Sequence, residues 1–209
     1  MPGISTWPGD AMARKRVAVL ISGRGSNMVS LIEAAKAKDY PAKIALVVSN
    51  RPDAPGLELA RKARIATEVV DHTRFGTDRE GFERTLQAVL EQNCIELVCL
   101  AGFMRLLTPW FVERWPSRLL NIHPALLPAF KGLNTHERAI AGGARTHGAT
   151  VHFVVPEMDS GPIIAQAEVP VLATDTPGTL AARVLAVEHR IYPEALRRVA
   201  EGIATAAAP

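Results

Sequence analysis

The first hundred residues alternate between short apolar runs and segments with helical spacing of apolar side chains. The apolar runs predict buried strands at residues 16–21, 43–49, 66–70 and 95–100. The helical spacing predicts helices at residues 28–38, 57–63 and 79–92, and Asp78 is suited to cap the last of them. Strands that alternate with helices indicate a parallel sheet covered by helices on both faces.

The second half of the chain follows a different pattern. It predicts short helices at residues 109–113 and 135–141, a strand at 119–123 and a long final helix at 177–201. Residues 149–155 and 163–171 alternate between apolar and polar positions and are typical of an antiparallel pair. We therefore expect an α/β fold: a Rossmann-like, mainly parallel sheet to which the C-terminal half adds antiparallel strands. A single domain is expected over residues 14–202, after a disordered extension at residues 1–13.

Composition narrows the possible partners. The chain has 209 residues, 48% of them hydrophobic and 22% charged, which suits one globular core. Its net charge of +3 comes from scattered Lys and Arg, not from the basic runs with aromatics that single-strand nucleic-acid binders use. No apolar run reaches membrane-spanning length, and the first twelve residues lack the parts of a signal peptide. We expect small anionic substrates, with neither nucleic acid nor membrane as a partner.

The sulfur and imidazole groups indicate no metal and no disulfide. Cys94 and Cys99 have odd spacing in a partly strand-like segment, so their side chains leave opposite faces. Free thiols suit a reducing compartment, and we expect a cytoplasmic protein. His147 and His152 lack further ligands at zinc-site spacing. A strand histidine such as His152 is more often a satisfied core group, although its face could also reach the pocket of His123 and Asp159. The oligomeric state stays open between monomer and homodimer.

A glycine-rich loop separates the first strand from the first helix. Gly23 and Gly25 let the backbone turn tightly, and Ser26 or Asn27 can cap the helix. The free N–H groups and the helix dipole at such a terminus favour an anion, typically phosphate. A plain capping loop is the alternative. Met28 at the third glycine position and the absence of an acidic residue after strand two disfavour a dinucleotide, and the Gly-Lys-Ser/Thr of a P-loop is absent.

The end of the strand at residues 119–123 carries the chemistry that stands out most. Side chains alternate along a strand, so Asn121 and His123 leave the same face. An amide and a protonated imidazole can both donate to an oxygen that gains negative charge. Asp159, in a loop bracketed by prolines, would hold the imidazole protonated if that loop folds over His123. A sharp turn after His123 also makes Leu127–Pro128 a candidate cis peptide.

Six stretches in this order resemble the glycinamide ribonucleotide formyltransferase family, folate-dependent enzymes of purine synthesis. They are residues 19–28 (Val-Leu-Ile-Ser-Gly-Arg-Gly-Ser-Asn-Met), 98–105 (Val-Cys-Leu-Ala-Gly-Phe-Met-Arg), 119–128 (Leu-Leu-Asn-Ile-His-Pro-Ala-Leu-Leu-Pro), 147–154, 158–162 and 188–193. The resemblance covers roughly residues 15 to 200. It departs before Glu188, where Leu-Ala-Val replaces the polar side chains of some members, and residues 1–13 have no counterpart in the family.

The resemblance implies a role for each matching residue. Asn121, His123 and Asp159 would be catalytic, and Gly25, Ser26, Asn27 and Glu188 would bind the ribotide. The folate, 10-formyltetrahydrofolate, would contact Arg79, Met104, Arg105, Leu106, Leu107, Asn121, Val155, Pro156, Glu157, Met158 and Asp159. The N-terminal half would therefore bind the ribotide phosphate, and the C-terminal half would bind the folate and carry out formyl transfer. No metal is implied.

Several alternatives remain at this point. The family implies formyl transfer from the folate to the amine of glycinamide ribonucleotide, whereas related enzymes hydrolyse the same folate or formylate methionyl-tRNA. Those relatives carry an additional domain that we do not expect in this chain, and the length of the chain and its Gly-Ser-Asn phosphate loop both favour the ribotide. A nucleotide-binding oxidoreductase and a binding module without catalysis are the alternatives from other classes.

Overall fold

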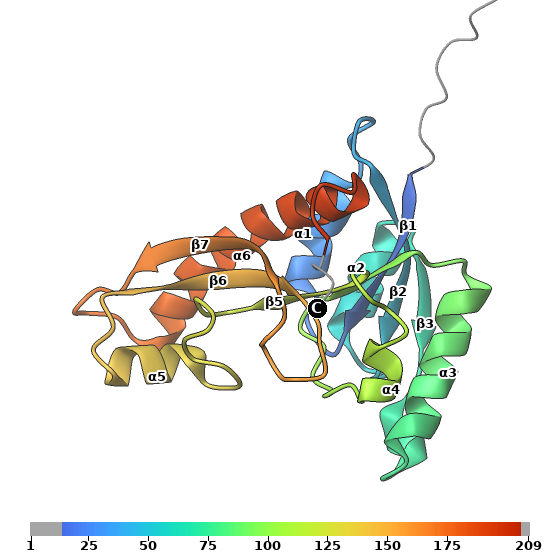
Figure 1. Cartoon of the computed structure of the whole chain (residues 1–209), viewed down its shortest axis with the longest axis horizontal. Coiled ribbons are helices and arrows are strands. Elements are labelled where there is room, and N and C mark those ends of the chain that lie inside the picture. Colours follow the sequence, from blue (N-terminus) through green and yellow to red (C-terminus); the bar gives the residue numbers. More distant parts are fainter. Residues whose placement is uncertain (1–13, 206–209) are drawn as a thin grey trace, which may run out of the picture.

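The computed structural model describes residues 14–205, which are built around one seven-stranded sheet in the order β3-β2-β1-β4-β5-β6-β7. The strands are β1 (Lys15–Ile21), β2 (Ala42–Ser49), β3 (Ala66–Val69), β4 (Leu97–Leu100), β5 (Leu119–His123), β6 (Thr146–Phe153) and β7 (Ile163–Pro170). The first five are parallel, β6 pairs antiparallel with β5, and β7 pairs antiparallel with β6 at the edge of the sheet. The mixed sheet that the sequence predicts is confirmed (Figure 1).

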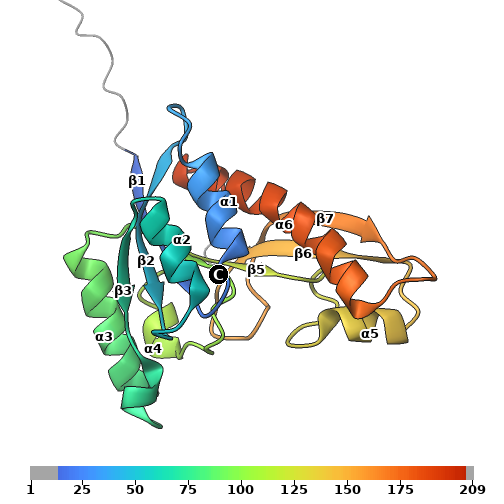
Figure 2. The same cartoon turned by 180° about the vertical axis from the view of Figure 1, so that it is seen from behind.

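Helices cover both faces of the sheet, as the alternation predicts. They are α1 (Ser26–Ala34), α2 (Pro55–Lys62), a 3₁₀ turn (His72–Phe75), α3 (Arg79–Gln92), α4 (Pro109–Val112), α5 (Thr135–Ala141) and α6 (Pro177–Ala200). Side chains of α1, α2, α5 and α6 belong to one buried apolar cluster, and those of α3 and α4 belong to a second. Figures 1 and 2 show these two helical layers from opposite sides. The predicted extension at residues 1–13 lies outside the described residues.

The first helix differs from its prediction at both ends. It begins at Ser26 and ends at Ala34, although apolar spacing predicts residues 28–38. After Ala34 the amides of Lys36 and Ala37 bond to carbonyls three residues back, which tightens the chain out of the α-helix. The chain then turns so that Tyr40, only 3% exposed, packs into the core. Asp78 does cap α3, because its side chain accepts from the Gly81 amide at 2.9 Å.

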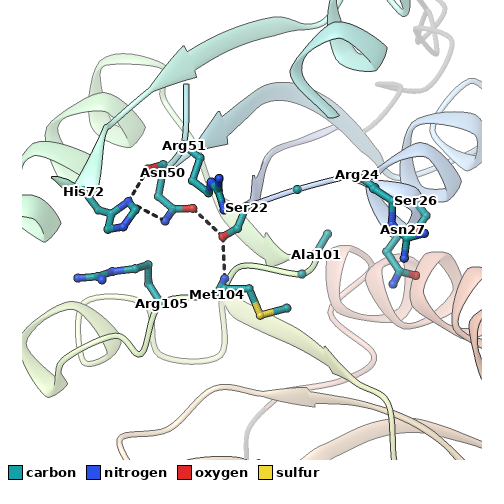
Figure 3. A pocket seen from close by; sticks show the side chains of 13 residues that line it. Ser22, Arg24, Ser26, Asn27, Asn50, Arg51, His72, Ala101, Met104 and Arg105 are labelled. Atoms are coloured by element: carbon teal, nitrogen blue, oxygen red, sulfur yellow. Dashed lines mark hydrogen bonds between the residues drawn. The ribbon is translucent and has the colours of Figure 1, made fainter. Parts of the chain in front are cut away.

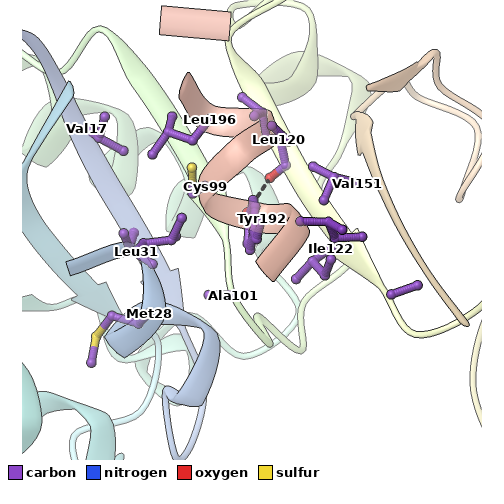
Figure 4. Close-up of a cluster of buried hydrophobic side chains, with 14 of the residues drawn as sticks. Val17, Met28, Leu31, Cys99, Ala101, Leu120, Ile122, Val151, Tyr192 and Leu196 are labelled. Atoms are coloured by element: carbon purple, nitrogen blue, oxygen red, sulfur yellow. Dashed lines mark hydrogen bonds between the residues drawn. The ribbon is translucent and has the colours of Figure 1, made fainter. Parts of the chain in front are cut away.

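Tyr192 of α6 fixes this long helix against the middle of the sheet (Figure 4). Its ring is fully buried, and its hydroxyl donates to the backbone oxygens of Leu100 and Leu120 at 2.9 and 3.3 Å. Leu100 is the last residue of β4, whereas Leu120 is the second residue of β5 and pairs with Cys99 of β4. Glu188 lies one helical turn before Tyr192, where its side chain accepts a hydrogen bond from Asn27 of α1.

The strand order reverses direction at β1, because β2 and β3 lie on one side of it and β4 and β5 on the other. In open α/β sheets, ligands bind beyond the carboxyl ends of the strands at such a switch point. The glycine-rich loop follows β1 there, and residues 101–105 follow β4. Leu127–Pro128, after β5, is a cis peptide, as the sharp turn led us to expect.

Candidate active site

A cavity of about 370 Å³ opens at the switch point of the sheet (Figure 3). The glycine-rich loop after β1 forms one wall, the residues after β2 a second and the residues after β4 a third. The lining residues are Ser22, Gly23, Arg24, Gly25, Ser26, Asn27, Asn50, Arg51, His72, Ala101, Gly102, Met104 and Arg105. The cavity therefore connects the predicted ribotide loop with Met104 and Arg105, two of the predicted folate residues.

The glycine-rich loop leaves the first turn of α1 free of a side-chain cap. Gly25 itself is the N-cap, in a left-handed conformation with φ of 73°, and no side chain caps the helix. The prediction that Ser26 or Asn27 caps it is therefore wrong, because the left-handed turn at Gly25 brings both residues inside the helix. The N–H groups at the start of α1 have no intrahelical partners, which suits an anion such as phosphate.

Asn27 and Glu188 meet at the base of this loop, although they are 161 positions apart in sequence. Asn27 Nδ2 donates to Glu188 Oε2 at 2.6 Å. Burial raises the pKa of the Glu188 carboxyl, and the hydrogen bond from Asn27 partly offsets that rise. Among the described residues, Asn27 Oδ1 is buried and has no hydrogen-bond partner. Asn27 Oδ1 and the Glu188 carboxylate can accept hydrogen bonds from hydroxyl or amine groups of a bound ligand.

Asp159 does lie over His123, as the sequence interpretation requires. Its Oδ2 is 3.4 Å from Nδ1 of His123, and both side chains are nearly buried. The Gly132 amide also donates to Asp159 Oδ2 at 2.9 Å, which holds the carboxylate in place. A Cβ on Gly161 would lie 1.8 Å from the Phe153 carbonyl, so only glycine lets this loop return so close to β6.

The second nitrogen of His123 also faces an acceptor. His123 Nε2 is 2.9 Å from the backbone oxygen of Phe130, while Nδ1 faces Asp159. A carbonyl and a carboxylate can only accept, so a proton on each ring nitrogen satisfies both contacts. The geometry therefore suits the protonated imidazole that stabilisation of an oxyanion requires.

Asn121 shares a face of β5 with His123, as predicted, and a residue of β6 adds to this cluster. His152 pairs with Asn121 in the β5–β6 register, and its Nε2 is 3.2 Å from Asn121 Nδ2. The same Nε2 is 3.7 Å from Asp159 Oδ1. Sequence alternation placed His152 on a strand, but the register opposite Asn121 is a tertiary feature that it could not supply.

Apart from Arg79 and Asn121, the predicted folate residues lie in the segment after β4 and in the loop after β6, the two strands that flank β5. Met104 and Leu106 are 71% and 61% exposed, and Met158 in the loop after β6 is 54% exposed. Leu107 is instead buried in the core cluster under α3 and α4. Arg79, at the start of α3, donates to the Leu106 carbonyl. Val155, Pro156 and Glu157 precede Met158 in the same loop. Neither this loop nor Arg79 lines the cavity at the switch point.

Three polar residues that the sequence did not single out connect the walls of the cavity (Figure 3). The Met104 amide donates to Ser22 Oγ at 2.7 Å, and that hydroxyl donates to Asn50 Oδ1 at 2.6 Å. His72 Nδ1 lies 2.8 Å from the backbone oxygen of Asn50. The ends of β1 and β2 thereby fix the start of the segment that carries Met104. The 3₁₀ turn that holds His72 was not predicted.

Residues 14–205 contain no candidate metal site, disulfide or membrane-spanning helix. No group of three or more His, Cys, Asp or Glu side chains in this range could hold a metal ion. Both cysteines are free, Cys94 exposed and Cys99 buried, as their spacing predicts. Over the same residues, no helix combines the length and the apolar character needed to cross a bilayer.

Comparisons with known proteins show the family to which the chain belongs. The family model described as formyl transferase matches residues 15–196. The chain is 46% identical over 186 residues to phosphoribosylglycinamide formyltransferase of Escherichia coli (strain K12), covering 89% of this chain and 87% of that protein. The structure of phosphoribosylglycinamide formyltransferase from Brucella melitensis has a TM-score of 0.86 and 49% identity, covering 93% of this chain and 100% of that one.

A longer relative matches over one part of its length. The chain is 49% identical over 187 residues to the trifunctional purine biosynthetic protein adenosine-3 of Gallus gallus. The match covers 90% of this chain and 18% of that protein. The chain therefore spans less than a fifth of this relative.

Proposed function

Because the chain belongs to the formyl transferase family, we propose that it transfers the formyl group of 10-formyltetrahydrofolate to the amine of glycinamide ribonucleotide. The products are formylglycinamide ribonucleotide and tetrahydrofolate, in the de novo synthesis of the purine nucleotide IMP. The observation that carries this proposal is the His123–Asp159 pair beside Asn121, on the same edge of the sheet as the uncapped loop at Gly25. Small-molecule substrates fit the cavity at the switch point of the sheet, and a cytoplasmic location fits the two free cysteines.

The ribotide enters this scheme with its phosphate on the glycine-rich loop. Gly25, Ser26 and Asn27 supply backbone N–H groups at the start of α1, where the helix dipole favours negative charge. Glu188, hydrogen-bonded to Asn27, accepts from the hydroxyl groups of the ribose. The glycinamide amine then extends along the sheet edge toward the end of β5.

The folate occupies the space between the segment after β4 and the loop after β6 in this scheme. The exposed apolar side chains of Met104, Leu106 and Met158 offer contacts for its flat ring system. Arg79 and Arg105 give the positive charge that its carboxylates require. The formyl group is then presented to Asn121 and His123.

Formyl transfer proceeds by direct attack of the amine on the formyl carbon. The tetrahedral oxyanion accepts hydrogen bonds from the Asn121 amide and from protonated His123. The oxyanion replaces the Phe130 backbone oxygen as the acceptor of the hydrogen bond from His123 Nε2. The attacking nitrogen loses a proton and the departing folate nitrogen gains one, and Asp159 moves this proton directly or through water. No covalent enzyme intermediate and no metal enter this scheme.

The first test is formyl transfer followed by the absorbance of the tetrahydrofolate product, with and without glycinamide ribonucleotide. Turnover that requires the ribotide is the expected result and supports the transferase. Turnover without the amine would identify a hydrolase of the same folate. If no turnover occurs in either case, titration with a nicotinamide cofactor tests the oxidoreductase alternative through a change in cofactor fluorescence.

Replacing Glu188 with glutamine is expected to raise the KM for the ribotide by about 10- to 100-fold. A hydrogen bond to a charged acceptor contributes about 1.5–3 kcal/mol, and the neutral amide loses most of this. The kcat should change little, because the contact is made equally in the ground state and the transition state. Steady-state kinetics at varied ribotide concentration measure the effect.

The matched control for that variant is Glu194→Gln, which changes an exposed carboxylate on the same helix. It should leave both constants unaltered. A kcat that falls in Glu188→Gln while the KM stays constant would contradict the binding role.

A further inference from the structure

His152 is a buried residue of β6 that the mechanism above does not use. Its side chain is 3% exposed and lies between Asn121 and Asp159. In the pairing of β6 with β7, the register shifts between Val151 and His152. The extra residue of this shift, Ile164, lies in β7. His152 faces Asn121 because the two residues pair directly in the unbroken register of β5 with β6.

We propose that His152 is a positioning residue that orients the Asn121 amide so that its nitrogen, and not its oxygen, presents hydrogens at the site of the oxyanion. The proposal rests on the proposed formyl transfer, because it concerns the oxyanion of that reaction. It requires that Nε2 of His152 act as an acceptor.

The first step concerns the proton on the ring. His152 Nδ1 is 2.8 Å from the backbone oxygen of Phe153, which can only accept, so Nδ1 carries a proton. In the neutral ring, Nε2 is then a bare acceptor. Burial lowers the pKa of His152 and favours this neutral form, although the nearby Asp159 carboxylate opposes the shift.

The second step concerns the amide. Asn121 Nδ2 lies 3.2 Å from Nε2, so a donor faces an acceptor. If the amide were reversed, Asn121 Oδ1 would face the lone pair of Nε2 and two acceptors would repel. One hydrogen of Nδ2 is therefore held by His152, and the other remains for a substrate oxygen. Without His152 the amide can rotate and present its carbonyl oxygen, which repels an oxyanion.

The decisive experiment combines two variants of His152 with the Asn121→Ala background. His152→Phe keeps an aromatic ring and removes the acceptor, whereas the side-chain oxygen of His152→Gln can still accept. We expect His152→Phe to lower kcat by about 10- to 100-fold with little change in either KM. His152→Gln should recover most of this loss. In the Asn121→Ala background, His152→Phe should have almost no further effect, because the group that it orients is gone.

Two results would overturn the proposal. One is an equal loss from His152→Phe with and without Asn121, and the other is a His152→Gln variant as impaired as His152→Phe. Thermal unfolding of every variant shows whether the fold is kept. His147→Gln is the matched control, because His147 is a buried histidine of the same strand that contacts His136 instead of Asn121. It should leave kcat unchanged.

A second readout does not depend on turnover. Nitrogen NMR of the wild-type imidazoles should show His152 with its proton on Nδ1, and a proton on Nε2 would contradict the proposal. If the wild-type protein shows this tautomer but transfers no formyl group, the proposed function fails and the positioning role of His152 fails with it. If the wild type is active and the two losses are independent, only the inference about His152 fails.

Discussion

Replacing Asp159 with asparagine is expected to lower turnover by about 10²- to 10⁴-fold, the usual contribution of a positioned acid or base. The variant removes a negative charge 3.4 Å from His123 Nδ1 and a group that can accept the proton of the attacking amine. The side-chain oxygen of asparagine can still accept from the Gly132 amide, which Asp159 Oδ2 now does at 2.9 Å. The loop should therefore keep its place, and the loss should reflect chemistry.

Single-turnover kinetics and equilibrium binding of both ligands separate these effects. Binding should stay close to that of the wild type while the chemical step slows. Glu168→Gln, an exposed carboxylate of β7, is the control and should react at the normal rate. Turnover retained in Asp159→Asn would remove Asp159 from the mechanism.

Replacing His123 with alanine is expected to cost about 10²- to 10³-fold in kcat, the typical effect of removing one oxyanion donor. The imidazole is 5% exposed and bridges Asp159 and the Phe130 carbonyl, so the variant also frees both of those acceptors. Thermal unfolding should accompany the kinetic measurement, because the loss of the ring leaves a small cavity. A kcat within a few-fold of the wild type would show that Asn121 alone suffices.

Combining the two changes tests whether His123 and Asp159 act as a unit. Groups that work together show losses that do not add. The kcat of the double variant should be only a little lower than that of the more impaired single variant, because Asp159 acts partly by stabilising the His123 cation. Fully additive losses would mean that Asp159 acts independently of the imidazole.

Local pattern was sufficient for most of the framework. Apolar runs and helical spacing predicted the seven strands and the six α-helices that residues 14–205 contain, because burial of one face demands a fixed period in each element. The same period placed Asn121 and His123 on one face of β5. The predicted ends of α1 were wrong because the backbone conformation, and not the apolar spacing, decides where that helix begins and ends. Gly25, in the left-handed region, moved the start of α1, and three-residue turns ended that helix early.

Less of the candidate site could be predicted from the local sequence pattern. The motif order and its resemblance to a family named Asn121, His123, Asp159 and Glu188, and their functional assignments remain predictions. The distance of 3.4 Å between His123 and Asp159 follows from a loop that returns over β5. The bond between Asn27 and Glu188 joins residues 161 positions apart, and no local rule links them.

The sequence by itself determined the periods of the strands and helices, the glycine-rich turn and the residue types available for chemistry. These depend on neighbouring residues along the chain, through backbone sterics and the separation of apolar from polar faces. Only the tertiary structure decided that His152 faces Asn121 and that Tyr192 fixes α6 so that Glu188 reaches Asn27. Strand register and helix packing depend on contacts between distant segments, which form only when the whole core is assembled.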